Sequence, residues 1–213
     1  MSWLLRTFSS SIGKKLLMAI TGLIFIGFLC VHLAGNLTLY KSSSAFNTYA
    51  EKLHALGPIL TAFEFGLLIF ALIHVTIGII LFVQNLKARS VPYELDRRAG
   101  GRTLSSVTMP YTGFIILAFV VFHLINFSFA DKTQRTIFEI VSSAFANPVY
   151  IIIYIFVMIV VAFHVNHGFW SAFQTIGANH PKYMPAIMAF SVIVSLIFGF
   201  GFGLLPIYVW FIG

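Results

Sequence analysis

The sequence predicts an all-α integral membrane protein built as a bundle of five transmembrane helices. The first observation is composition: 59% of the 213 residues are hydrophobic and 9% are charged, whereas a soluble domain carries about 25% charged residues. The second is a series of five long apolar segments, at residues 16–40, 58–86, 107–129, 148–172 and 185–211. Each reaches the roughly 20 residues that a helix needs to cross about 30 Å of hydrocarbon. We therefore expect one membrane domain that covers residues 1–213.

The first apolar segment follows Lys14 and Lys15 and has to be distinguished from a secretory signal. It is longer than the apolar core of a signal peptide, which has about 7–15 residues, and it shows no clear cleavage site with small residues. It also carries His32 and Asn36 deep inside it. We therefore interpret it as the first span.

The distribution of Lys and Arg predicts the orientation of the bundle, since loops rich in these residues stay in the cytoplasm. The amino end and the second and fourth loops together carry nine: Arg6, Lys14, Lys15, Lys87, Arg89, Arg97, Arg98, Arg102 and Lys182. The first and third loops carry four: Lys41, Lys52, Lys132 and Arg135. This imbalance predicts a cytoplasmic N-terminus and a C-terminus outside.

The formal net charge of +7 does not indicate a nucleic-acid-binding protein. The positive residues lie in loops that flank the spans, and no nucleic-acid-binding motif is present, so anionic lipids or an acidic partner surface explain them better. The inner loop 87–102 mixes these residues with Glu94 and Asp96 around Pro92. It is interpreted either as a docking surface or as a plain solvated loop.

Both outer loops contain a short amphipathic pattern. In the first, apolar residues recur at helical spacing after a run of serines and before Gly57-Pro58: Phe46, Tyr49, Leu53 and Leu56. In the third, the pattern ends at Asn147-Pro148: Ile137, Ile140, Val141, Ala144 and Phe145. We expect two short helices at the headgroup boundary, which either cap the bundle or cover a binding site.

Each of the first four spans carries a histidine at depth, and the fifth carries none. His32 lies nine residues before Lys41 and His123 eight before Asp131, which places both about 12–14 Å below the outer loops. His74 lies 13 residues before Lys87 and His164 lies 16 after Pro148, so both are about 20–24 Å from one boundary, in the inner half. Depth thus predicts an outer pair, His32 with His123, and an inner pair, His74 with His164.

Paired imidazoles on facing membrane helices are typical ligands of haem iron, so the pattern predicts two haems b stacked across the membrane. Bis-histidine ligation leaves iron no free position, and such a haem passes electrons without bond chemistry. Small residues one turn from a ligand would leave room for a porphyrin: Gly35, Ala71, Gly78 and Gly168. His167 shares a helix face with His164 and is a candidate for a haem propionate, or else an ordinary interfacial histidine.

The chain resembles a known family at this point. Ser-Ile-Gly-Lys-Lys at 11–15, His-Leu-Ala-Gly-Asn at 32–36 and one histidine in each of the first four spans are similar to the cytochrome b558-type membrane anchor of succinate:quinone oxidoreductases. These succinate dehydrogenases and fumarate reductases are bacterial cytoplasmic membrane complexes, and their anchors have five helices and two haems. The resemblance covers essentially the whole chain.

The resemblance implies a flavoprotein and an iron-sulfur protein on the cytoplasmic face, with electrons exchanged between succinate or fumarate and a membrane quinone, usually menaquinone. His32 and His123 match the ligands of the haem distal from those partners, and His74 and His164 match those of the proximal haem. The chain has no nucleotide fingerprint or cysteine cluster, so dicarboxylate chemistry is expected in the other subunits. Some family members carry an acid beside the span IV ligand for proton transfer, and here residues 161–165 contain none.

Quinone chemistry moves protons together with electrons and requires a polar group near the membrane edge. The candidates in the outer half are Glu51, His54, Asn36, Asn126 and Glu64. Glu51 is the preferred proton group, and a solvated loop acid is its plain alternative. Asn36 and Asn126 each lie one turn beyond a histidine, so a haem propionate is their alternative partner. Glu64 is either buried and functional or hydrated near the interface.

Two other functions fit part of the pattern. One is a di-haem cytochrome b subunit of a formate dehydrogenase or hydrogenase, although such anchors commonly have four spans. The other is a proton-coupled transporter that uses histidines as relays, although internal inverted repeats and helices broken near the midplane are not evident in the first four spans. A cytochrome b absorption band and the identity of the copurifying subunits distinguish the three.

Overall fold

The computed structural model describes residues 2–87 and 104–212, and the regular structure in this part of the chain is helical throughout. Within these residues, five helices are long and apolar enough to cross a membrane: Ser11–Tyr40, Pro58–Lys87, Thr108–Ser128, Pro148–Thr175 and Met184–Ile212. The predicted architecture of five membrane-spanning helices is confirmed. The inner loop 87–102 lies outside the described residues, except for Lys87.

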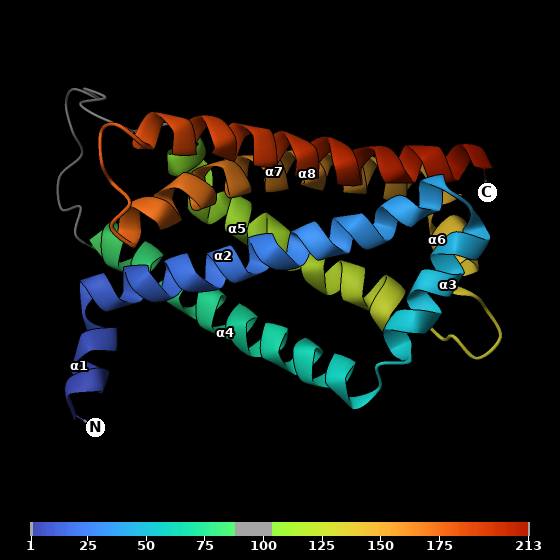
Figure 1. Cartoon of the computed structure of the whole chain (residues 1–213), viewed down its shortest axis with the longest axis horizontal. Coiled ribbons are helices and arrows are strands. Elements are labelled where there is room, and N and C mark those ends of the chain that lie inside the picture. The colour runs from blue at the N-terminus through green and yellow to red at the C-terminus, as the bar shows by residue number, and fades with distance from the viewer. Residues whose placement is uncertain (1, 88–103, 213) are drawn as a thin grey trace.

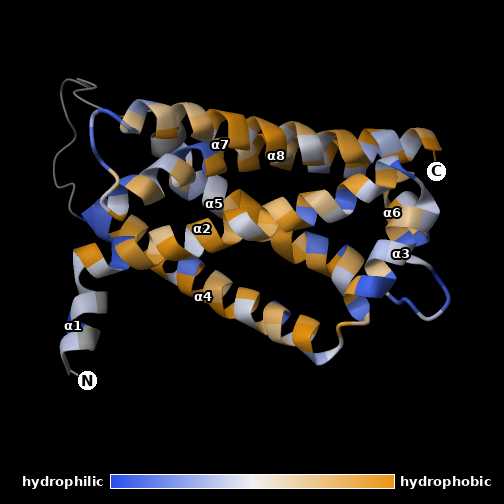
Figure 2. Ribbon diagram, viewed as in Figure 1, coloured by the Kyte–Doolittle hydropathy of each residue, from blue (hydrophilic) through white to orange (hydrophobic). Residues whose placement is uncertain are grey.

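The long helices run back and forth, so the two termini lie at opposite ends of the bundle (Figure 1). In chain order the elements are α1 (Ser2–Ser9), α2 (Ser11–Asn36), the 3₁₀ turn η1 (Leu37–Tyr40), α3 (Ser43–His54), α4 (Pro58–Lys87), α5 (Leu104–His123), the π-helical turn η2 (Leu124–Ser128), α6 (Ile137–Phe145), α7 (Pro148–Thr175) and α8 (Met184–Ile212). The short helices α3 and α6 lie together at the C-terminal end (Figure 1). Hydrophilic residues gather toward the two ends (Figure 2), as expected for a chain that crosses a lipid bilayer.

Local sequence explains where the helices at this end begin. Ser42 is the N-cap of α3, since its side chain accepts a hydrogen bond from the backbone N–H of Ala45. Gly57, at φ +54°, reverses the chain before Pro58. Thr136 and Glu139 form a capping box at the start of α6. The two short helices that the sequence predicts, between the first and second spans and between the third and fourth, are confirmed.

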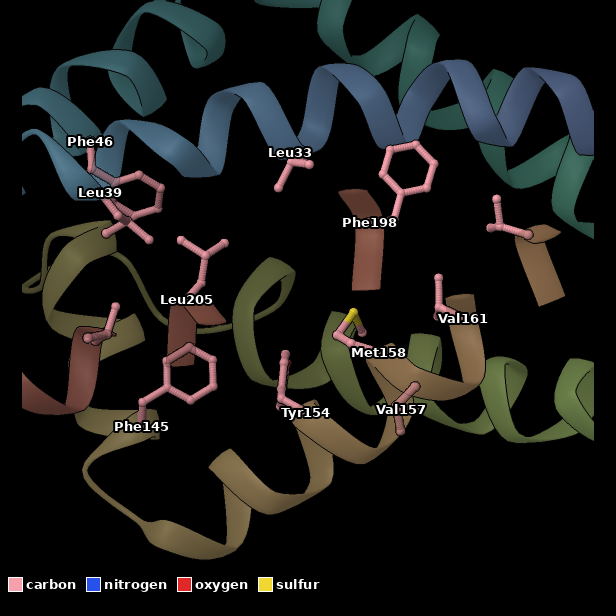
Figure 3. Packing of buried hydrophobic residues seen from close by; sticks show 12 residues of the cluster. Leu33, Leu39, Phe46, Phe145, Tyr154, Val157, Met158, Val161, Phe198 and Leu205 are labelled. Carbon is pink, nitrogen blue, oxygen red and sulfur yellow. The ribbon is translucent and has the colours of Figure 1, made fainter. Parts of the chain in front are cut away.

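The core lies between α7 and its neighbours α8, α5 and α2. Its buried members come mostly from α7 and α8 (Figure 3): Leu33, Leu39, Phe46, Phe145, Tyr154, Val157, Met158, Val161, Val165, Phe198, Leu205 and Val209. At Gly201 a Cβ atom would lie 2.8 Å from the end of the Leu33 side chain, so a larger residue on α8 would require Leu33 of α2 to move. By contrast α4 packs mainly against α2. Only 6% of an 18-residue apolar stretch of α4 is buried, compared with 33% of the corresponding stretch of α7.

Candidate functional site

The outer pair of histidines lies where α2 and α5 face each other. The ring centroids of His32 and His123 are 6.0 Å apart, with their planes at 86°. Two imidazoles that bind one metal ion have centroids about 6 Å apart, given metal–nitrogen bonds of about 2 Å and the radii of two rings. The structure therefore brings together the two rings that the depth estimate pairs, at the separation that a shared metal ion requires.

Aromatic side chains surround the outer pair. Four phenylalanine rings lie within 6 Å of one histidine ring or the other: Phe28 and Phe202 beside His32, and Phe119 and Phe127 beside His123. Nδ1 of His123 is 3.0 Å from the hydroxyl of Tyr154 on α7. This contact leaves Nε2 of His123 as the nitrogen available to a metal ion.

The inner pair is held by hydroxyl groups. Nδ1 of His74 on α4 is 2.9 Å from Oγ1 of Thr21 on α2, and Nδ1 of His164 on α7 is 3.0 Å from Oγ1 of Thr112 on α5. Each ring is thus fixed through Nδ1 to the preceding long helix, and Nε2 of each remains available.

The two inner histidines have matching surroundings because the chain repeats a pattern. Residues 18–22 and 109–113 both read Met-x-x-Thr-Gly, and residues 74–78 and 164–168 both read His-Val-x-x-Gly. In each half the threonine bonds the histidine, and a Cβ atom at the first glycine, Gly22 or Gly113, would lie 3.6 Å from Cε1 of the histidine ring. The pair α2 and α4 therefore corresponds to the pair α5 and α7.

Threonines Thr21 and Thr112 are site residues that reasoning from the sequence missed, together with the glycine after each. The repeated pentapeptide was the available signal, but its period is longer than that of the repeats usually sought. The glycines that were expected to make room beside the ligands face other side chains. A Cβ atom would lie 3.7 Å from Met18 at Gly78, and 2.5 Å from the Tyr49 ring at Gly35.

His167 lies one turn beyond His164, and its ring packs edge-on against Trp170 at 4.8 Å between centroids. Nδ1 of His167 is buried, and no hydrogen-bond partner for it is found among the described residues. Buried polar atoms are almost always bonded, so this nitrogen needs a partner, which is either a water molecule or a bound group. A carboxylate such as a propionate would satisfy it.

The candidates for proton transfer come from four segments of the chain: α2, α3, α4 and η2. Glu51 and His54 are exposed on α3, and Glu64 is exposed on α4. Asn36 donates from Nδ2 to the carbonyl oxygen of His32, so its side chain bonds the backbone of its own helix. Asn126 accepts from the hydroxyl of Tyr150 at 2.9 Å. No two of these five are joined by a described hydrogen bond.

A polar groove of about 270 Å³ opens beside Asn126, where η2, α6 and the start of α7 meet. Its polar lining consists of Asn126, Arg135, Ser143, Asn147 and Tyr150. The helix continues past His123 as the π-helical turn η2, and π-helical turns are frequent at functional sites. This groove gives the outer histidine level a polar edge.

The described residues contain no group of three or more His, Cys, Asp or Glu side chains that could hold a metal ion. The arrangement suits a group that supplies most of its own metal ligands and takes two from the protein, which is the case for haem. Comparison with the models of known protein families, with curated proteins and with solved structures finds no match.

Proposed function

We propose that this protein is a di-haem cytochrome b membrane anchor, which transfers electrons between a membrane quinone, menaquinone by resemblance, and soluble redox subunits of a succinate dehydrogenase or fumarate reductase complex. One observation carries the proposal: four long apolar helices each contribute one histidine, and the rings of His32 and His123, the outer pair predicted from depth, lie 6.0 Å apart. The short motifs at 11–15 and 32–36 add the resemblance to succinate:quinone oxidoreductase anchors.

The residues fit two haems b. The separation of His32 and His123 suits a shared iron, and both inner histidines present Nε2. The orphaned Nδ1 of His167 suits a propionate near the inner pair. A bound haem supplies a carrier of single electrons. The four histidines would hold the iron atoms, two for each haem, and the phenylalanines beside His32 and His123 would limit the access of water to the outer haem.

The two histidine levels are well placed for transfer across the bundle. On α2, Thr21 contacts His74 of the inner pair and lies eleven residues before His32. On α5, Thr112 contacts His164 and lies eleven residues before His123. Both helices therefore separate the levels by about 16 Å along their axes. In this proposal the outer level exchanges electrons with quinone, and Glu51 and His54, both exposed on α3, are the groups that exchange protons. The inner level faces the flavoprotein and iron-sulfur subunits at the cytoplasmic side of a bacterial inner membrane.

The test is to purify the chain from its membrane together with the subunits that accompany it. We expect a reduced-minus-oxidised band of cytochrome b, two haems per chain, and a flavoprotein that supports succinate-dependent dye reduction. A His180→Ala variant is the matched control, since His180 lies in the loop before α8, away from both pairs, and should keep the full spectrum.

The same purification decides between the alternatives. A molybdenum or nickel-iron partner with two haems would contradict the succinate assignment and favour a formate dehydrogenase or hydrogenase subunit. A colourless chain would contradict haem binding altogether and favour a transporter with a histidine relay.

A further inference from the structure

We infer that Thr21 and Thr112 are positioning residues, which fix the tautomer and the ring orientation of His74 and His164 so that Nε2 of each is directed to the metal of the inner haem. The inference rests on the proposed function. It concerns two hydroxyl groups on α2 and α5 that belong to neither ligand pair.

The hydrogen-bond donors in these contacts can be assigned from the protons available. A threonine hydroxyl has one proton to donate. Thr21 donates it to the carbonyl oxygen of Leu17, with Oγ1 and O 2.7 Å apart, and Thr112 donates to that of Met109 at 2.9 Å. Each Oγ1 must then accept from the histidine, so Nδ1 of His74 and Nδ1 of His164 carry the proton. A neutral imidazole protonated at Nδ1 has its lone pair on Nε2, the form that binds a metal ion.

The surroundings hold this assignment in place. Thr21 is 2% exposed and Thr112 8% exposed, so water does not compete for either hydroxyl. Thr is stiff at χ1, and its bond to the preceding turn of the helix fixes Oγ1 further. The glycine after each threonine faces the histidine ring, because a Cβ atom there would lie 3.6 Å from Cε1, and a larger side chain would meet the ring.

The same construction occurs twice, in chain segments that are far apart. The Thr21 and His74 contact joins residues 53 apart, and the Thr112 and His164 contact joins residues 52 apart. An isolated threonine in a membrane helix commonly bonds its own backbone and nothing else. Here two threonines in matching pentapeptides both also reach a predicted ligand.

Outer-shell partners of a ligating histidine fix its tautomer and raise its basicity, and their loss typically lowers metal affinity by about 10- to 100-fold. The experiment replaces the hydroxyl with a methyl group of similar volume, in Thr21→Val, Thr112→Val and the double variant, within the complete complex. Thr21→Ser and Thr112→Ser restore the hydroxyl. Thr175→Val is the matched control, since Thr175 also donates to the carbonyl oxygen four residues before it.

The readouts are haem content per chain and the low-spin electron paramagnetic resonance signals of each haem, which respond to ring orientation. We expect both valine variants to lower the apparent affinity for the inner haem by about 10-fold or more and to shift its signal, with the outer signal unchanged and the serine variants restored. An inner haem that keeps its signal and affinity in the double variant overturns the inference. An equal loss in Thr175→Val, or no rescue by serine, also overturns it. If the complex without any substitution contains no haem, that result contradicts the proposed function and not this inference.

Discussion

The inner and outer histidine levels are built from different side chains. At the inner level, each histidine is bonded by a buried threonine on the preceding long helix, and the two halves of the chain supply the same residues. At the outer level, phenylalanine rings pack around both histidines, and Tyr154 bonds only His123. The inner level therefore has the same hydrogen bond in both halves and one phenylalanine contact, that of Phe25 with His74, whereas the outer level has one hydrogen bond and four phenylalanine contacts. Two pairs of the same residue can thus differ in what orients their rings.

The largest effect is expected from removal of a ligand. His74→Ala or His164→Ala should remove the inner haem and halve the haem content, because one imidazole cannot hold iron from both sides. His32→Ala or His123→Ala should remove the outer haem in the same way. Haem extraction and the reduced-minus-oxidised spectrum measure both. Loss of the outer haem alone in a His74 variant would contradict the pairing.

The next largest effect is expected from filling the space beside the inner rings. Gly22→Leu or Gly113→Leu places a side chain where a Cβ atom alone already lies 3.6 Å from the histidine ring. Overpacking of this kind costs about 1–3 kcal/mol, so we expect partial loss of the inner haem and an intact outer haem. Gly27→Leu is the matched control on the same helix, since nothing lies within 4 Å of a Cβ atom there. Equal loss of the inner haem in all three variants would show that the loss does not depend on the space beside the inner histidine rings.

A smaller effect is expected from Tyr154→Phe, which removes the hydroxyl that contacts Nδ1 of His123. The ring stays packed against Phe119 and Phe145, so only the hydrogen bond is lost, worth about 1 kcal/mol. The outer haem should stay bound with a shifted midpoint potential, and the inner haem should keep its own. A redox titration followed at the cytochrome b band measures both. A shift in the midpoint potential of the inner haem would contradict the conclusion that Tyr154 acts on the outer level alone.

The smallest effect is expected at the outer end of the bundle. Oδ1 of Asn47 on α3 accepts the backbone N–H of Phe138 on α6 at 2.9 Å. Asn47→Ala should lower the free energy of unfolding by about 1 kcal/mol and leave both haem spectra unchanged, as seen by thermal unfolding and absorption. Ser44→Ala on the exposed side of α3 should change neither. A changed spectrum of the outer haem in Asn47→Ala would show that the contact between α3 and α6 also orients the outer histidines.

The elements of this fold follow from the sequence because their causes are local. Hydrophobic length determines the spans, and residues such as Ser42, Gly57 and Asn147 determine where the segments between them begin or end. Helical rise converts position along a span into depth, which is why His32 could be grouped with His123. Each of these inferences needs only the sequence near one residue.

The supporting residues could not be predicted in the same way. A helix face identifies which side chains point together, but not which neighbouring helix they meet, so Gly78 was expected beside a ligand and lies near Met18. Thr21 bonds both its own helix and His74, and only the first of these bonds is local. Partners between helices depend on how each helix is rotated within the bundle, which hydropathy does not determine.

The shallow packing of α4 has a consequence for how the protein is made. Helices gain little from apolar contact with one another in lipid, so polar contacts between them matter more. On α4 such contacts lie in the inner half: His74 meets Thr21, and Gln84 accepts a hydrogen bond from Lys14 at 3.1 Å. If an inner haem links α4 to α7, then part of its binding energy is folding energy. A newly inserted chain would then complete its assembly only when haem arrives, and haem supply would determine how much of the protein escapes degradation.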